Sequence, residues 1–254
     1  MRANPRHPVA LTIAGSDSGG GAGIQADLRT FALSGVYGAT VVTCLTAQNR
    51  QAVSRIEPAS PKMIRAQLNA VFAVDPPTAA KTGMLYSAVI VREVARFLRA
   101  FPRLPLVVDP VMISTSGRRL LQTDAVSVLE NELLPRATLV TPNRAEAEIL
   151  ARQAIRSPED LRFAARAIQI RFGCATLVKG GHLPGTNEAI DVLFDGVNEW
   201  LFSSPRVQGI RLHGTGCAYS AAITAALAGG NPLVKAVGCG KQFITDTIQA
   251  QSRL

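Results

Sequence analysis

The chain has 254 residues, of which 47% are apolar and 18% charged, and this composition excludes a largely disordered protein. Lys and Arg outnumber Asp and Glu by 27 to 18, a net charge of +9, but the basic residues are scattered. We therefore expect a diffuse positive surface that attracts an anionic nucleotide, and no nucleic-acid partner. The four cysteines form no C-x-x-C pair, which argues against a zinc site or disulfide framework and indicates reduced thiols in a cytoplasm. The longest stretch without Asp, Glu, Lys or Arg, residues 212–234, is rich in small residues and predicts no membrane span.

Short β-branched runs alternate with amphipathic stretches along the chain. The predicted strands cover residues 9–14, 39–46, 79–84, 106–111, 138–141 and 175–179. The predicted helices cover residues 24–34, 61–74, 87–100, 123–134, 158–172, 216–228 and 233–251. Residues 190–194 and 199–202 flank a turn sequence and predict a hairpin. The pattern predicts one α/β domain over residues 1–254, with a mostly parallel central sheet, helices on both faces and an antiparallel edge hairpin.

In such a sheet the active site lies beyond the carboxyl ends of the strands, so the residues that end each strand are its candidates. Gly15-Ser-Asp-Ser-Gly-Gly-Gly-Ala-Gly23 follows the first predicted strand and opens a helix. Five glycines allow backbone N–H groups to converge on a ligand, although a flexible turn would look similar. A dinucleotide site is set aside, because the acidic residue expected about 20 positions later is missing.

His213-Gly-Thr-Gly-Cys217 precedes a long apolar helix. Gly214, Thr215 and Gly216 would present free N–H groups at a helix N-terminus, where the helix dipole also favours an anion. Cys217 falls in the first turn, where we expect a thiol of lowered pKa. The alternative is a turn of small residues before a buried helix. None of the five lysines lies in a P-loop pattern.

Three further strand ends carry polar residues. Asp109 ends one apolar strand, Asn143 and Glu146 begin a helix after the next, and Lys179 precedes Gly-Gly-His182. Each residue alone has a purely structural interpretation as a helix cap, a turn cap or a lysine with an exposed head. Together they would place two carboxylates, a lysine and an anion hole on one rim of the sheet, as magnesium, a polyphosphate and a phosphoryl acceptor require.

These motifs occur together, in order, in a known family. They comprise Ala14–Asp27, Ala47-Gln-Asn49, Lys81-Thr-Gly-Met84, Asp109-Pro-Val-Met112, Thr141-Pro-Asn143, Lys179-Gly-Gly-His182 and His213-Gly-Thr-Gly-Cys217. Over residues 9–250 the chain resembles the hydroxymethylpyrimidine/phosphomethylpyrimidine kinases of thiamine biosynthesis, in the ribokinase-like superfamily. The resemblance implies a three-layer sandwich and, as in the family, a homodimer. It also implies transfer of phosphoryl groups from MgATP to 4-amino-5-hydroxymethyl-2-methylpyrimidine and then to its monophosphate.

The resemblance also assigns roles. Asp27 and Gln48 would hydrogen-bond the aminopyrimidine, and Gly15, Met84 and Val111 would shape its pocket. Asp109 and Glu146 would hold Mg²⁺. Asn143 and Thr215 would lie beside the nucleotide, and Lys179 would lie along the ATP phosphates. The transferring phosphoryl group would be contacted by Gly214, Thr215, Gly216 and Cys217. Cys217 would act as a general base or, alternatively, contribute only its backbone N–H.

Two other functions remain open at this point: a pyridoxal kinase, because that activity occurs in the same superfamily, and a catalytically silent pyrimidine-binding protein. The chain departs from its relatives at Arg50-Gln-Ala52, where they tend to carry Thr and Gly, and it ends at Leu254 without their frequent Gly-rich tail. We therefore expect differences in closure over the pyrimidine and on the adenine side.

Overall fold

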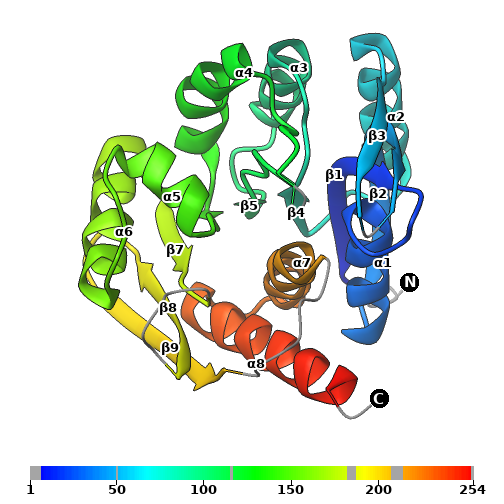
Figure 1. The fold of residues 1–254 in the computed structure, drawn as a ribbon. Helices are drawn as coiled ribbons and strands as arrows, with labels where there is room; N and C mark the ends of the chain where they lie inside the picture. Colours follow the sequence, from blue (N-terminus) through cyan, green and yellow to red (C-terminus); the bar gives the residue numbers. More distant parts are fainter. Residues whose placement is uncertain (1–6, 50, 115–116, 182–186, 207–213, 253–254) are drawn as a thin grey trace.

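The computed structural model describes residues 7–49, 51–114, 117–181, 187–206 and 214–252. The chain forms a nine-stranded sheet with helices on both faces (Figure 1). The strands are β1 (Val9–Asp17), β2 (Tyr37–Gln48), β3 (Val53–Pro58), β4 (Ala79–Thr82), β5 (Leu106–Val108), β6 (Leu139–Val140), β7 (Ala175–Lys179), β8 (Glu188–Phe194) and β9 (Glu199–Pro205). The helices are α1 (Gly23–Leu33), α2 (Pro61–Val74), α3 (Ala88–Leu98), α4 (Thr123–Val128), α5 (Arg144–Ala151), α6 (Pro158–Phe172), α7 (Thr215–Ala228) and α8 (Leu233–Gln251).

The strand order is β3-β2-β1-β4-β5-β6-β7-β8-β9. The six strands from β2 to β7 in this order are parallel, and β3, β8 and β9 each run antiparallel to their neighbour. The predicted α/β class, the mostly parallel sheet and the β8–β9 edge hairpin are confirmed. The second antiparallel edge, β3, was not predicted. Its residues are mostly exposed, so it lacks the apolar run by which a buried strand is recognised.

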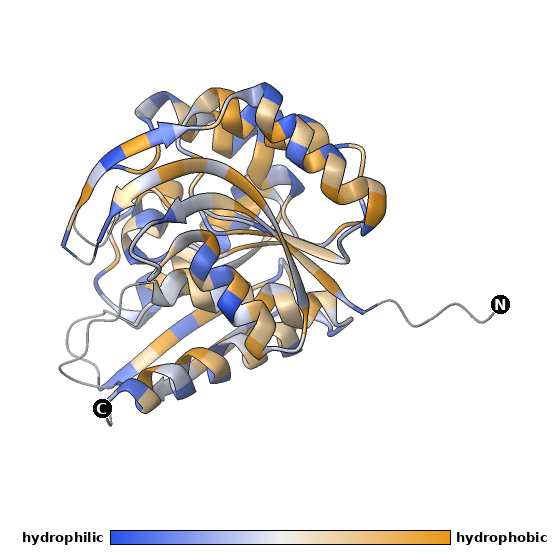
Figure 2. Ribbon diagram, turned by 90° about the vertical axis from the view of Figure 1, so that its right-hand side faces the viewer, coloured by the Kyte–Doolittle hydropathy of each residue, from blue (hydrophilic) through white to orange (hydrophobic). Residues whose placement is uncertain are grey.

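Alternate residues of the central strands pack into two separate cores. On β5, Leu106 and Val108 face a core shared with α2, α3, α4, α5 and α6. Val107 and, on β6, Leu139 face the opposite core, which α1, α7 and α8 cover. These apolar strands are buried on both faces, as expected for parallel strands between two helical layers. Figure 2 shows the complementary pattern in the outer helices, where hydrophilic and hydrophobic positions alternate along each ribbon.

Local sequence signals set the helix ends. At α6 the Ser157 side chain accepts a hydrogen bond from the Asp160 N–H, and the Asp160 carboxylate accepts one from the Ser157 N–H. This capping box is followed by Pro158 at the first helical position, and the helix ends at Gly173 in the left-handed conformation. The predicted helix 123–134 is shorter than expected: after α4 the backbone continues as a π-helical turn (Leu129–Leu133) and a 3₁₀ turn (Leu134–Arg136). Pro135 cannot donate the hydrogen bond that would prolong an α-helix.

Within the described ranges, each helix is too short or too polar to cross a bilayer.

We expect Leu139→Ala to lower the free energy of unfolding by about 2–5 kcal/mol. Leu139 lies on the short strand β6, and its side chain is fully buried in the core that α7 and α8 cover. Leu201→Ala is the matched control, since Leu201 is 60% exposed on the edge strand β9, and it should change stability by less than about 0.5 kcal/mol. Urea unfolding followed by circular dichroism measures both. Equal losses in the two variants would contradict the two-core description.

Candidate active site

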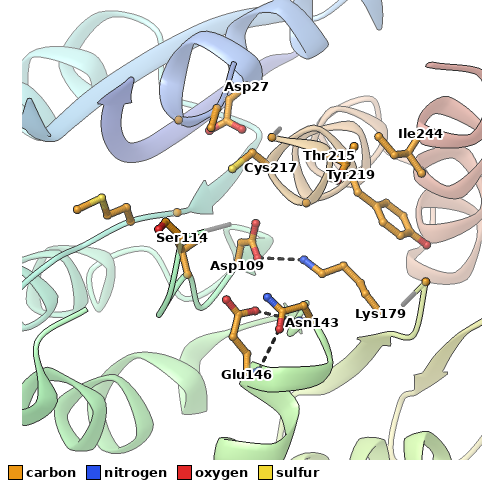
Figure 3. Close-up of a pocket in the computed structure, with 18 of the residues that line it drawn as sticks. Asp27, Asp109, Ser114, Asn143, Glu146, Lys179, Thr215, Cys217, Tyr219 and Ile244 are labelled. Carbon is orange, nitrogen blue, oxygen red and sulfur yellow. Dashed lines mark hydrogen bonds and ion pairs between the residues drawn. The ribbon is translucent and has the colours of Figure 1, made fainter. Parts of the chain in front are cut away.

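One cavity of about 1370 Å³ lies at the carboxyl ends of the parallel strands. Every site residue expected from the sequence lines it: Gly15, Asp27, Gln48, Met84, Asp109, Val111, Asn143, Glu146, Lys179, Gly214, Thr215, Gly216 and Cys217. Figure 3 shows several of these side chains converging from different elements. The structure therefore brings the predicted residues together, as the rule for parallel sheets requires.

The glycine loop after β1 is organised by its own aspartate. The Asp17 carboxylate accepts hydrogen bonds from the N–H groups of Gly19, Gly21 and Ala22, at 2.8–3.0 Å. The Gly20 N–H donates to the Asp17 carbonyl oxygen. For residues 19–22 the expectation that the N–H groups converge on a ligand is therefore wrong, because the loop satisfies them internally. The glycines instead let the loop fold tightly at the mouth of the cavity.

The end of the cavity nearest β1 and β2 includes apolar residues. A Cβ atom at Gly15 would lie 2.8 Å from the Cys44 sulfur and 3.4 Å from the Met84 sulfur. A residue with a side chain at position 15 would therefore clash with Cys44. Met84 belongs to a small apolar cluster against which Val111 packs, and both residues line the cavity. A flat aromatic ring fits such a surface.

Two polar side chains border this apolar end. The Gln48 Oε1 atom accepts a hydrogen bond from Thr46 Oγ1 at 3.3 Å. Asp27 is fully buried, and its Oδ1 atom lies 2.6 Å from Lys81 Nζ. Its Oδ2 atom accepts from Thr12 Oγ1 at 2.6 Å. Both carboxylate oxygens are thus already bonded, and each retains lone-pair capacity for another donor.

Lys179 lies between a carboxylate and the start of α7. Its Nζ atom is 3.2 Å from Asp109 Oδ1, as the dashed line in Figure 3 marks. A Cβ built on Gly216 would lie 3.4 Å from the same Nζ atom. Burial alone would lower the pKa of Lys179, but Asp109 and Glu146 raise it above the ordinary value. The lysine is therefore held charged at the point where an anion would meet the helix.

Glu146 is a helix-capping residue as well as a site carboxylate. Its Oε2 atom accepts from the Asn143 N–H at 2.9 Å, and the Asn143 side chain accepts from the Glu146 N–H, closing a capping box at the start of α5. Glu146 Oε1 accepts from the Met112 N–H at 3.3 Å. Burial raises the pKa of Glu146, Lys179 opposes that rise, and Asp109 adds to it. Asn143 and Glu146 thus cap the helix and also line the cavity.

Asp109 and Glu146 are the carboxylates suited to a magnesium ion. Within the described ranges, no three His, Cys, Asp or Glu side chains cluster closely enough to hold a metal by themselves. Mg²⁺ does not need such a cage, because it commonly uses one or two carboxylates, substrate phosphates and several waters. The two carboxylates next to Lys179 fit that kind of site.

The N-terminus of α7 packs directly on the glycine loop. Gly214 caps the helix with φ of 83°, and a Cβ there would lie 1.9 Å from the Gly21 carbonyl oxygen. Only glycine allows this contact. Gly214 makes no side-chain capping bond, and the first turn contains no acidic residue. The backbone N–H groups of Thr215, Gly216 and Cys217 have no partner within the helix. All three residues line the cavity, and a helix N-terminus of this kind suits an anion.

The thiol of Cys217 differs from the sequence expectation. Burial raises its pKa to about 11. Lys81 opposes this rise, and Asp27 and Asp109 add to it. The prediction of a lowered pKa is therefore wrong: two carboxylates and burial outweigh the helix N-terminus.

His182 and His213, which the motifs include, lie outside the described residues, and so does Arg50. The neighbouring Gln51 and Ala52 N–H groups both donate to the Asn49 side chain. This turn connects β2 and β3 beyond Gln48.

The sequence analysis quoted Lys81 only within a motif and did not single it out, although Lys81 is the one charged residue of the predicted strand 79–84. It also missed the pair between Lys241 of α8 and Asp191 of β8, 2.8 Å apart, in which Asp191 also accepts from the Gly180 N–H. Nothing in the local sequence connects two residues 50 positions apart.

Comparisons with known proteins identify the family to which the chain belongs. The family model described as "Phosphomethylpyrimidine kinase" matches residues 17–254. A hydroxymethylpyrimidine/phosphomethylpyrimidine kinase of Rhizobium meliloti (strain 1021) is 48% identical over 247 residues, covering 97% of this chain and 92% of the relative. The crystal structure of a phosphomethylpyrimidine kinase from Clostridium difficile 630 is 41% identical, with TM-score 0.84, covering 94% of this chain and 99% of that one. An ADP complex of Bacillus subtilis pyridoxal kinase is 36% identical, with TM-score 0.86, covering 94% and 91%.

Since the pKa of Cys217 is about 11, its thiol keeps its proton near neutral pH. We expect alkylation of Cys217 by iodoacetamide to be slow at pH 7–8 and to accelerate about tenfold per pH unit above it, since only the thiolate reacts. Peptide mass spectrometry at several pH values measures this rate, with the exposed Cys239 as an internal control for reagent access. A Cys217 rate that is already level at pH 7–8 would show a lowered pKa instead.

Proposed function

Because the chain belongs to the phosphomethylpyrimidine kinase family, we propose that it phosphorylates 4-amino-5-hydroxymethyl-2-methylpyrimidine and then its monophosphate, with ATP as donor, in thiamine biosynthesis. The observation that carries this proposal is one continuous cavity. It joins an end with apolar walls, bordered by Asp27 and Gln48, to a helix N-terminus beside Lys179 and two carboxylates.

The apolar end is proposed to hold the pyrimidine ring. Gly15, Met84 and Val111 provide apolar walls. The Gln48 amide offers a donor and an acceptor, which match a ring nitrogen and an exocyclic amino group. The Asp27 carboxylate offers a further acceptor. This set suits an aminopyrimidine better than pyridoxal, which presents a phenolic oxygen and an aldehyde.

The opposite part of the cavity is proposed to hold the ATP phosphates. Lys179 provides a fixed positive charge, and the N–H groups of residues 215–217 face the developing charge of the transferring phosphoryl group. Asn143 and Thr215 would lie beside the nucleotide. Asp109 and Glu146 would hold Mg²⁺, which when bound neutralises charge on the phosphates. The related ADP complex of the Bacillus subtilis pyridoxal kinase supports a nucleotide site in this fold.

Cys217 is proposed to act through its backbone N–H. A thiol whose pKa is raised to about 11 carries its proton at neutral pH and accepts no second one. A loose phosphoryl transfer requires little help from a base, so the anion site at the start of α7 suffices. The general-base alternative from the sequence is therefore the less favoured one.

The direct test is a kinase assay with purified protein, MgATP and a panel of pyrimidine and pyridoxal acceptors, with products identified by mass. We expect the monophosphate and then the diphosphate of the aminopyrimidine. Phosphorylation of pyridoxal in preference to the pyrimidine, or binding without turnover, would replace this proposal with one of the two alternatives.

Asp109→Asn should lower kcat on the order of 10²-fold, because it removes a charge that acts at the phosphates, and it should raise the magnesium concentration needed for half-maximal rate. Binding of the pyrimidine, measured by calorimetry, should be retained. Asp124→Asn, an exposed position at the start of α4, is the control and should leave both quantities unchanged. A wild-type magnesium dependence in Asp109→Asn would remove Asp109 from the metal site.

Gln48→Leu should reduce kcat/KM for the aminopyrimidine by roughly 5- to 150-fold, the equivalent of about 1–3 kcal/mol for unpaired polar groups. Pyridoxal should lose much less, because it cannot use both halves of the amide. Gln51→Leu, an exposed glutamine in the same hairpin, provides the control. Equal losses for both substrates would show that Gln48 does not recognise the ring.

A further inference from the structure

Lys81 is a buried charge that the proposed mechanism does not use. It lies on β4 with no exposed surface, and its Nζ atom is 2.6 Å from Asp27 Oδ1 on α1. Thr12, its partner in the parallel β1–β4 register, donates to the other Asp27 oxygen at 2.6 Å. Three elements therefore fix one carboxylate, which lines the proposed pyrimidine end of the cavity.

Stability alone is a weak reason for this arrangement. Removing two charges from water costs about as much as their attraction returns, so a buried ion pair is seldom worth more than well-packed apolar side chains. The neighbouring strand residues Ala79 and Ala80 are apolar and equally buried. Thus Lys81 is the exception in its strand, and its charge is directed at one atom of the proposed substrate site.

The charge state of Lys81 decides what Asp27 can offer to a ligand. Burial would lower the pKa of Lys81, but Asp27, and then Cys217 and Asp109, raise it. Burial raises the pKa of the Asp27 carboxyl, with Lys81 and Thr12 opposing that rise. With Lys81 present, both oxygens of Asp27 accept hydrogen bonds, and the group is a pure acceptor. Without Lys81, burial would favour the protonated acid, which also donates.

We infer that Lys81 is a positioning residue that fixes the hydrogen-bond polarity of the pyrimidine site: by holding Asp27 as an acceptor, it requires the ligand to present a donor there. This inference rests on the proposed function. The Asp27 carboxylate, held between Lys81 and Thr12, cannot change its polarity to match another ligand. The site therefore selects an amino group on the ring over an oxo group in the same place.

The test compares two acceptors that differ only at this position: the 4-aminopyrimidine and its 4-oxo analogue, each with saturating MgATP. The measured quantity is the ratio of their kcat/KM values. We expect the wild type to prefer the amino compound strongly, and Lys81→Met to narrow that preference at least about tenfold, because a protonated Asp27 can donate to the oxo group. Lys81→Arg, which retains the charge, should restore most of the preference.

Lys241→Met is the matched control. Lys241 forms the comparable buried pair with Asp191 on another wall of the cavity, so its loss tests the general effect of breaking such a pair. Both rates are expected to fall in this variant, with the ratio unchanged within about twofold. A ratio that narrows equally in Lys241→Met would overturn the assignment to Lys81.

Folding is checked by circular dichroism and thermal unfolding. If Lys81→Met does not fold, Lys81→Gln removes the charge while keeping a donor to Asp27, and the same narrowing is expected. A folded Lys81→Met or Lys81→Gln protein with the wild-type ratio overturns the inference. Independently of any variant at position 81, the ¹³C chemical shift of the Asp27 carboxyl carbon in the wild type, assigned with Asp27→Asn, should be that of a carboxylate at neutral pH. A protonated Asp27 would overturn the inference as well.

Failure of the proposed function is recognised separately. If the wild type does not phosphorylate the aminopyrimidine, the proposed function fails and the ¹³C measurement still decides the state of Asp27. If the wild type is active and discriminates while the variants keep its ratio, only the inference about Lys81 fails.

Discussion

The carbonyl oxygen of Gly21 lies in the space that a side chain at position 214 would occupy. Because Gly214 has none, the loop after β1 packs on the start of α7, although the two segments are almost two hundred residues apart in the chain. This contact brings the apolar end of the cavity close to the end that contains the first N–H groups of α7. Substrate ring and phosphate groups can then be held in one space, which is what transfer between them requires.

Ion pairs between lysines and aspartates recur along the walls of the same cavity. Three of the five lysines in the chain form ion pairs with aspartates along its walls: Lys81 with Asp27, Lys179 with Asp109 and Lys241 with Asp191. Each pair connects two different elements of the fold. The much more numerous arginines form the ion pairs of the helical exterior, such as Arg162 with Glu199 and Arg171 with Glu130. An ammonium group is a compact point charge, whereas the planar guanidinium presents several donors in a fixed geometry, and in this chain the two groups pair with carboxylates in different places.

The strand ends were the most predictable part of the site. Asp109, Asn143 and Lys179 each follow an apolar run, and parallel topology alone brings such positions together. Sequence patterns could not reveal pairs such as Lys81 with Asp27, because the contact depends on the register between β1 and β4 and on the placement of α1. The pKa of the Cys217 thiol could not be predicted from the sequence for a similar reason. Its position in the first turn was predictable, but the carboxylates that outweigh the helix dipole come from distant segments.

Asp17 holds the loop beside the cavity in one shape before any ligand binds. Its carboxylate and carbonyl together satisfy four N–H groups of the loop that follows β1. The loop is thus held in shape by the chain itself, and its conformational entropy is lost when the protein folds and not when a ligand arrives. Because the loop is already ordered, a ligand that contacts it binds with a higher affinity than it would if binding also had to order the backbone.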